Sequence, residues 1–228
     1  MRITNLKLVA VGIIVFIIFG IYLIINPKPI IQSNNYNNST TQTSKPLTPV
    51  VTATPDLPAT KNPAITQPIN DALTRVTKKP FGIYVSPKSS PTMPERFTGY
   101  HTGVDFETTA AEQNQDVTIY AICPGPLVLK KYASGYGGVA VQQCQIQSQA
   151  VTVIYGHLKL SSISISQNEE LKAGQQIGIL GQGYSTETDG ERKHLHLGIH
   201  LGKTITLLGY VQNQNDFKQW LDLATLLK

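Results

Sequence analysis

Residues 193–200, which read Lys-His-Leu-His-Leu-Gly-Ile-His, decide how this chain folds and hold three of its five histidines. Side chains alternate between the two faces of a β-strand. In a strand over this stretch, His194, His196 and His200 share one face, and leucine and isoleucine occupy the other. The first two imidazoles stand about 6–7 Å apart along the strand, so one could bind a metal while its neighbour takes part in chemistry. The pattern therefore predicts a strand that buries its leucines and forms one wall of a metal site.

The sequence around this strand is typical of an all-β domain. From Phe81 onward, short apolar runs are interrupted by glycine and proline, and no long amphipathic helical pattern occurs before residue 213. We expect a hairpin turn at 135–138 and a closing amphipathic helix over 213–228. The predicted fold class is mostly β, a compact antiparallel β sandwich or barrel-like domain over 80–212 followed by that short C-terminal helix. Strands are predicted at 81–85, 117–121, 127–132, 138–146, 151–155, 176–180 and 194–201.

The first 26 residues predict a membrane anchor. Residues 1–7 carry Arg2 and Lys7, and the eighteen residues 8–25 form an apolar run without any charge. At 1.5 Å per residue this run gives about 27 Å, enough to cross a bilayer, and the positive residues before it predict a cytoplasmic N-terminus. A cleaved signal peptide is the alternative. The run ends in Ile-Ile-Asn-Pro without a small-x-small cleavage site, so 8–26 is predicted to be an uncleaved transmembrane signal anchor.

Residues 27–79 are predicted to be a disordered linker. They contain eight prolines together with many threonines, asparagines and serines. Such a composition cannot bury enough apolar surface to offset the entropy of ordering the chain. We expect disorder or polyproline II over most of the linker, with a short helix over 70–77 just before the domain.

The net charge of +5 lies outside the predicted domain. Residues 1–79 hold eight Lys/Arg and two Asp/Glu, giving +6, whereas residues 80–228 hold eleven and twelve, giving −1. A near-neutral domain lacks the basic surface that follows phosphates, which argues against nucleic acid as a partner. Cys123 and Cys144 are too few for a disulfide scaffold, and they are either two buried thiols or one disulfide in an oxidising compartment.

A second motif, Tyr-His-Thr-Gly-Val-Asp-Phe, lies upstream at 100–106. In a straight strand His101 and Asp105 would be about 13 Å apart, so both reach one metal only if the chain bends between them, which Gly103 permits. Catalytic zinc binds three protein ligands and leaves the fourth position to water. The motif and one histidine of the later His-x-His pair would form such a site. His157, at the end of an apolar strand, would by itself more often be structural.

Taken in order, these motifs resemble those of the lysostaphin/LytM-type zinc metallopeptidases, which cut peptidoglycan peptides. The shared order is His-x-Gly-x-Asp, then Tyr-(Ala/Gly)-His-Leu, then a glycine-rich segment at 174–181, then His-Leu-His. The resemblance covers about residues 80–212 and implies the duplicated hybrid motif fold, with an open groove over the metal.

The resemblance also implies a role for each motif histidine. His101, Asp105 and His196 would bind Zn²⁺, and the catalytic pair that does not bind the metal would be His157 and His194. These two imidazoles would handle proton transfer while zinc activates water. Which of them is the base and which stabilises the oxyanion is left open by the sequence.

One segment departs from the family pattern. Where members often have Thr-Gly-Pro or a similar turn before His-Leu-His, residues 188–193 read Thr-Asp-Gly-Glu-Arg-Lys, which is longer and charged. This loop would line the groove, so the substrate preference stays open. We expect Glu107, Asp189 and Glu191 to be solvated and His200 to be peripheral.

These predictions describe a single-pass protein of the cell membrane with an extracytoplasmic C-terminal domain. Its function would be that of a zinc metalloendopeptidase hydrolysing peptide cross-links of bacterial cell-wall peptidoglycan. The expected partners are the peptidoglycan peptide, the membrane through the N-terminal helix, and cell-wall or envelope machinery proteins. The alternative is a catalytically silent LytM-type module that activates or positions another cell-wall hydrolase. Because silent members usually lose zinc ligands and this chain keeps all five motif positions, the resemblance favours the enzyme.

Overall fold

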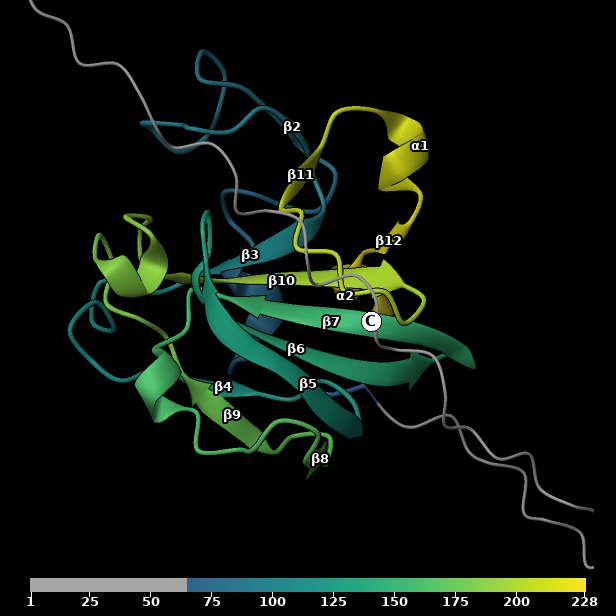
Figure 1. The fold of residues 1–228 in the computed structure, drawn as a ribbon. Helices are drawn as coiled ribbons and strands as arrows, with labels where there is room; N and C mark the ends of the chain where they lie inside the picture. Colours follow the sequence, from purple (N-terminus) through teal and green to yellow (C-terminus); the bar gives the residue numbers. More distant parts are fainter. Residues whose placement is uncertain (1–64) are drawn as a thin grey trace, which may run out of the picture. The chain divides into compact units, whose positions relative to one another are not determined.

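The computed structural model describes residues 65–228, which are coloured in Figure 1. The predicted cytoplasmic segment 1–7, the predicted anchor 8–26 and most of the predicted linker lie outside the described residues. Within 65–228, no helix has the length and apolarity needed to cross a bilayer.

Antiparallel strands are the main regular structure of the described chain, as the sequence predicts. They form three open sheets, with strand orders β1-β2-β11, β12-β10-β7-β6-β5-β8 (with β3 also paired to β10) and β4-β9, and these strands do not close into a barrel. The strands are β1 (Tyr84–Val85), β2 (Gly99–His101), β3 (Gly103–Glu107), β4 (Thr118–Tyr120), β5 (Gly125–Ala133), β6 (Gly137–Ile146), β7 (Gln149–Gly156), β8 (Glu170–Leu171), β9 (Gln176–Ile179), β10 (His194–Leu201), β11 (Tyr210–Val211) and β12 (Trp220–Leu221). Short 3-10 helices are η1 (Ala72–Arg75), η2 (Leu160–Ser162) and η3 (Thr186–Thr188).

β10 has a central place in the largest sheet. One edge pairs with β7, and the other pairs with β3 along its first half and with β12 near its end. In Figure 1, β7, β6 and β5 follow β10 in turn, and β2 and β11 lie above it. The hairpin between β5 and β6 turns at Ser134–Tyr136, which confirms the predicted glycine-rich turn.

The alternation predicted for β10 fixes which face meets the core. Leu195, Leu197 and Ile199 are at most 1% exposed and belong to the main hydrophobic cluster, with Phe106 of β3 and Tyr155 of β7. Burying each of these side chains contributes about 1.5–3 kcal/mol, so a slip of one residue would be costly. The core therefore holds the histidine face of β10 in place.

The predicted C-terminal helix over 213–228 is wrong in its length. The segment forms two short helices, α1 (Gln214–Phe217) and α2 (Leu223–Leu226), separated by β12. The interruption arises because Trp220 pairs with His200 of β10 and is 5% exposed. Edge pairing and burial of one aromatic residue thus override the helical spacing of the apolar residues.

The domain also begins earlier than residue 80. Residues 65–80, which we call the strap, pack against the strands, and Ile69 and Ala72 are at most 1% exposed in the main core. The hydroxyl of Thr66 donates to the carbonyl of Ala121 at 2.9 Å. The proline-rich composition continues into the strap, which conceals this boundary in the sequence. The expected helix over 70–77 is present only as the single turn η1.

Cys123 and Cys144 form a disulfide, with Cα atoms 6.1 Å apart. This result decides between the two alternatives that the sequence leaves open. The bond ties the segment before β5 to β6 at the far end of the hairpin, so it has no part in binding a metal.

Candidate metal centre

β10 brings the motif residues together by its register. His196 is paired with Asp105 of β3 on one edge and with Gly156 of β7 on the other. Directly paired residues of antiparallel strands have Cβ atoms about 4.5–5.5 Å apart. His157 follows Gly156 at once, so three motifs that are distant in sequence meet in one row across the sheet.

His101 reaches this row from a different sheet. β2 ends at His101 and β3 begins at Gly103, so the chain changes sheet at Thr102. The Thr102 amide and hydroxyl donate to the carbonyls of Gly209 and Leu208, which fix the corner. The expected bend is thus present, but it occurs at Thr102 rather than at Gly103.

Gly103 is required for another reason. A Cβ atom there would lie 2.7 Å from both Cε1 and Nε2 of His196 and 2.6 Å from the carbonyl oxygen of Leu197. The ring of His196 therefore packs directly on the backbone between the two residues of the upstream motif.

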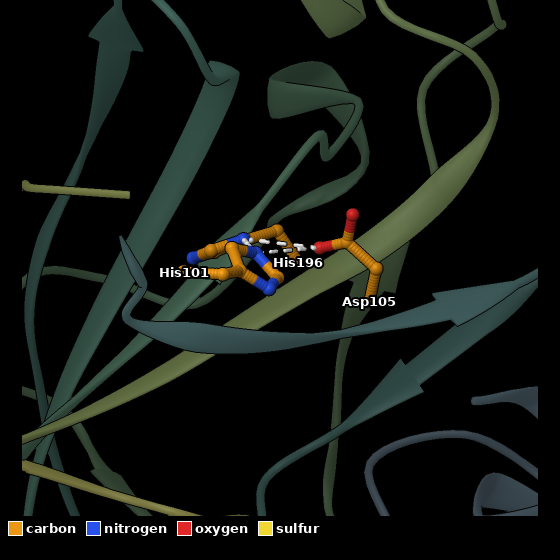
Figure 2. Close-up of side chains that lie close together, drawn as sticks. All are labelled: His101, Asp105 and His196. Carbon is orange, nitrogen blue, oxygen red and sulfur yellow. Dashed lines mark hydrogen bonds and ion pairs between the residues drawn. The ribbon is translucent and has the colours of Figure 1, made fainter. Parts of the chain in front are cut away.

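Three candidate ligand atoms converge at the centre of Figure 2. Nε2 of His101 lies 3.0 Å from Nδ1 of His196, and the Oδ1 atom of Asp105 is 3.2 Å and 3.1 Å from these two nitrogens. All three residues are at most 4% exposed. The structure thus brings together the three residues expected to bind zinc.

This triangle fits a metal ion better than a hydrogen-bond network. Each imidazole nitrogen has one in-plane direction for a proton or a lone pair, so the three mutual contacts cannot all be hydrogen bonds. Ligand atoms about 2.0–2.1 Å from a tetrahedral zinc ion would be about 3.3 Å apart, close to the sides of the triangle. Burial lowers the pKa of His196 to about 4, so its ring is neutral at pH 7, the form that binds metal.

Neighbouring groups orient each ligand. Nδ1 of His101 lies 3.2 Å from the carbonyl of Pro80 in the strap, and donating a proton there leaves Nε2 free for a metal. The Oδ2 atom of Asp105 accepts from Nη2 of Arg192 at 2.9 Å and lies 3.2 Å from Nε2 of His194. Burial would raise the pKa of Asp105, but the imidazoles of His194 and His101 hold it well below its usual range.

The two remaining motif histidines face each other beside the triangle. The ring centroids of His157 and His194 are 4.3 Å apart. Nδ1 of His194 is 2.9 Å from the carbonyl of Arg192, whereas Nδ1 of His157 is buried without a hydrogen-bond partner in residues 65–228. Burial first, and the nearby His194 next, hold the pKa of His157 well below 6.5. Its φ of 63° is unusual for a residue with a side chain, and such conformations cluster at functional sites.

A cleft of about 280 Å³ opens onto these groups. His157, His194, His196 and Asp105 line it, together with the ring of Tyr136. The hydroxyl of Tyr136 is buried and has no partner within the described chain, and burial holds its pKa above the usual range, so it stays a proton donor. His200 does not line the cleft; it packs against Trp220 with ring centroids 4.8 Å apart, as a peripheral residue would.

The expectation that the nearby acidic residues are solvated is wrong. Glu107 binds Arg192, and Asp189 and Glu191 bind Arg96. The first pair had a partial sequence signal, because alternation along β3 puts Glu107 on the face of Asp105 and Arg192 lies only two residues before the first histidine of β10. The partners of Asp189, which include the amide of Gly135, depend on loop positions that no period predicts.

Sequence reasoning also missed Lys79. Its side chain is 3% exposed, lies 2.6 Å from a carboxylate oxygen of Glu95 and donates to the hydroxyl of Tyr210 at 3.0 Å. Its carbonyl accepts from the amide of Asp105 at 3.1 Å. A lysine within a predicted linker gives no sequence signal of such burial.

Comparison with known proteins agrees with the motifs. Residues 99–207 match the family model described as Peptidase family M23. Among solved structures, the chain is similar to the catalytic domain of the antimicrobial peptidase lysostaphin from Staphylococcus simulans. The two share 20% sequence identity with a TM-score of 0.47, and the match covers 71% of this chain and 98% of that one. It is similar to LytU at 19% identity and a TM-score of 0.42, covering 71% and 82%. A zinc containing peptidase from Vibrio cholerae is similar at 18% identity and a TM-score of 0.43, covering 73% and 40%. No curated protein matches the chain. The match of residues 99–207 to peptidase family M23 thus supports a LytM-type domain in this part of the chain.

Proposed function

We propose that this protein is a zinc metalloendopeptidase that hydrolyses peptide cross-links of bacterial peptidoglycan. The observation that carries the proposal is the triangle of His101, Asp105 and His196, whose ligand atoms lie within 3.2 Å of one another beside two further histidines. A zinc ion bound there would lower the pKa of its water toward about 7, so that hydroxide would be available at neutral pH to attack a peptide carbonyl.

The two other histidines suit different steps of proton transfer. His157 has a buried, unpartnered Nδ1 among the described residues, and its lowered pKa keeps the ring neutral. A neutral ring with a free nitrogen is suited to accept the proton of the attacking water. His194 lines the same cleft, and each of its ring nitrogens faces an oxygen acceptor, at Arg192 and Asp105, so a hydrogen bond from its Nε2 to the developing oxyanion would take the place of the contact with Asp105.

We further propose that the domain works outside the cytoplasm, attached to the cell membrane. The Cys123–Cys144 disulfide supports an oxidising compartment. The apolar run within 8–26 and the positive residues before it support a single-pass anchor. The proline-rich linker would let the domain reach wall peptides at a distance from the membrane.

A catalytically silent module that activates another wall hydrolase is the second candidate. It shares the fold and the substrate surface with the enzyme, so only turnover separates the two. Retention of all three candidate ligands and both catalytic histidines favours the enzyme.

Zinc content and peptide release from purified peptidoglycan, measured on the full chain, test the proposal. We expect about one zinc per chain, loss of zinc in His196→Ala, and release of peptides by the wild-type protein. Wild-type protein without zinc and without cleavage would contradict the enzyme and its metal site together. Bound zinc without turnover would support the silent module. Retention of the full chain in membranes after a carbonate wash tests the anchor.

A further inference from the structure

Arg192 joins the charged loop 188–193 to the candidate metal centre. Its Nη2 donates to Oδ2 of Asp105 at 2.9 Å, and its Nε donates to the Oε2 and Oε1 atoms of Glu107 at 2.9 and 3.1 Å. The three side chains are 10%, 2% and 11% exposed, so the contacts are shielded from water.

The register of the sheet explains why these charges meet. β3 and β10 are antiparallel, with His194 opposite Glu107 and His196 opposite Asp105. Arg192 lies two residues before His194, just outside β10, and Glu107 lies two residues after Asp105 on the same face of β3, so the antiparallel register brings the two charges together. The contact between Arg192 and Glu107 therefore lies directly beside the candidate ligand Asp105, two residues further along β3.

The two carboxylate oxygens of Asp105 have different partners. Oδ1 faces the nitrogens of His101 and His196, and Oδ2 faces Arg192 and His194. A buried carboxylate without partners on Oδ2 could rotate or present both oxygens to an ion. The guanidinium, which is itself held by Glu107 and makes the shorter of the two contacts, restricts that freedom together with His194, and it also offsets part of the negative charge.

We propose that Arg192 is a positioning residue for the metal ligand Asp105, with Glu107 as its support. It sets the carboxylate so that Oδ1 alone faces the ion. This inference rests on the proposed zinc site. It gives a role to the segment that departs from the family pattern, since the charge of the loop is directed inward at a ligand.

Arg96 provides a matched control from the same region. It also binds two carboxylates, those of Asp189 and Glu191, at 3.4 and 2.9 Å. Its side chain is 47% exposed, and within the described residues its polar contacts are to Asp189 and Glu191, neither of which is a candidate ligand. A general effect of removing an arginine from this loop network should therefore appear equally in Arg96→Gln.

The test is the zinc dissociation constant of the full chain, measured by competition with a chromophoric chelator, and the visible spectrum of the Co²⁺-loaded protein. We expect Arg192→Gln to weaken zinc binding about 10–100-fold, as loss of a group that orients a ligand does, and to change the Co²⁺ spectrum. Arg192→Lys, which keeps the charge but cannot bridge two carboxylates, should recover part of the affinity. Arg96→Gln should stay within about twofold of the wild type.

If Arg192→Gln binds zinc within about twofold of the wild type with an unchanged spectrum, the inference is wrong and the zinc site stands. If the wild-type protein itself binds no zinc, the inference and the proposed function both fail. If Arg192→Gln does not fold, the double variant Arg192→Met/Glu107→Met serves instead, because it removes both charges of the Arg192–Glu107 pair and leaves neither one buried alone. The same loss of zinc affinity is expected there, and wild-type affinity would overturn the inference.

Discussion

Nε2 of His101 lies 3.0 Å from Nδ1 of His196, although 95 residues separate them in the sequence. The two rings come from different sheets, and the corner at Thr102 joins those sheets. The candidate metal centre is therefore a junction of sheets, and its geometry depends on small residues and backbone contacts around the corner.

Gly103→Ala should impair metal binding without removing a ligand. The new methyl group would meet Cε1 and Nε2 of His196 at 2.7 Å and the carbonyl oxygen of Leu197 at 2.6 Å, so the ring must shift from its place beside Gly103. We expect the zinc dissociation constant to rise more than tenfold, by chelator competition. Gly198→Ala is the control, because its Cβ first meets Trp220 at 3.2 Å and His196 only at 3.7 Å. Equal zinc affinities for the two variants would contradict this role of Gly103.

Glu112 should make stability depend on pH below neutrality. Its carboxylate accepts two hydrogen bonds from Arg75, at 2.7 and 2.8 Å, and these lower its pKa from 4.5 to about 2. The unfolded state binds the proton more tightly, so the contribution is full above pH 4.5 and is lost as the pH falls toward 2.

Glu112→Gln should therefore lower the free energy of unfolding by about 1 kcal/mol at pH 7, a value reduced for solvent screening. The difference in unfolding free energy from the wild type should shrink below pH 4.5. Urea denaturation at several pH values measures it. Glu170→Gln, at an exposed position of β8, is the control for the loss of one surface carboxylate. A difference that stays constant between pH 7 and pH 3 would contradict the assignment.

Replacing both cysteines should destabilise the domain while sparing the metal centre. The bond closes a loop with a sequence separation of 21. Loop-closure entropy for that length predicts a loss of about 3 kcal/mol in the double variant Cys123→Ala/Cys144→Ala. Denaturation under non-reducing conditions measures the loss, and zinc affinity should be unchanged. Stability equal to that of the oxidised wild type would show that the bond contributes nothing.

The strap should prove to be part of the domain. A chain that begins at residue 81 lacks Ile69 and Ala72 in the core and the carbonyls of Lys79 and Pro80 that hold Asp105 and His101. Compared with a chain that begins at residue 56, we expect a loss of at least about 3 kcal/mol in unfolding free energy and weaker zinc binding. Equal stability and affinity of the two chains would show that the strap is dispensable.

The sequence predicts regular features well because they follow from local periods. The strand at 194–201, its histidine face and the turn at 135–138 all come from alternation and glycine placement. The change of sheet at Thr102 does not, since it depends on pairing of β2 with β11, more than 100 residues later. The inward role of Arg192 also escaped prediction, because a charged loop is usually solvated. Alternation gives the face of Glu107, but its position beside Arg192 depends on the register of β3 against β10.

The endopeptidase account is tested most directly by counting new amino termini in purified peptidoglycan treated with the zinc-loaded full chain and, in parallel, with His157→Ala. His157 is not a candidate ligand, so the variant should keep its zinc. The account predicts that the wild-type protein releases new amino termini and that His157→Ala does so about 10²–10⁴-fold more slowly. No new amino termini from wild-type protein that holds its zinc, or equal rates for the two proteins, would contradict it.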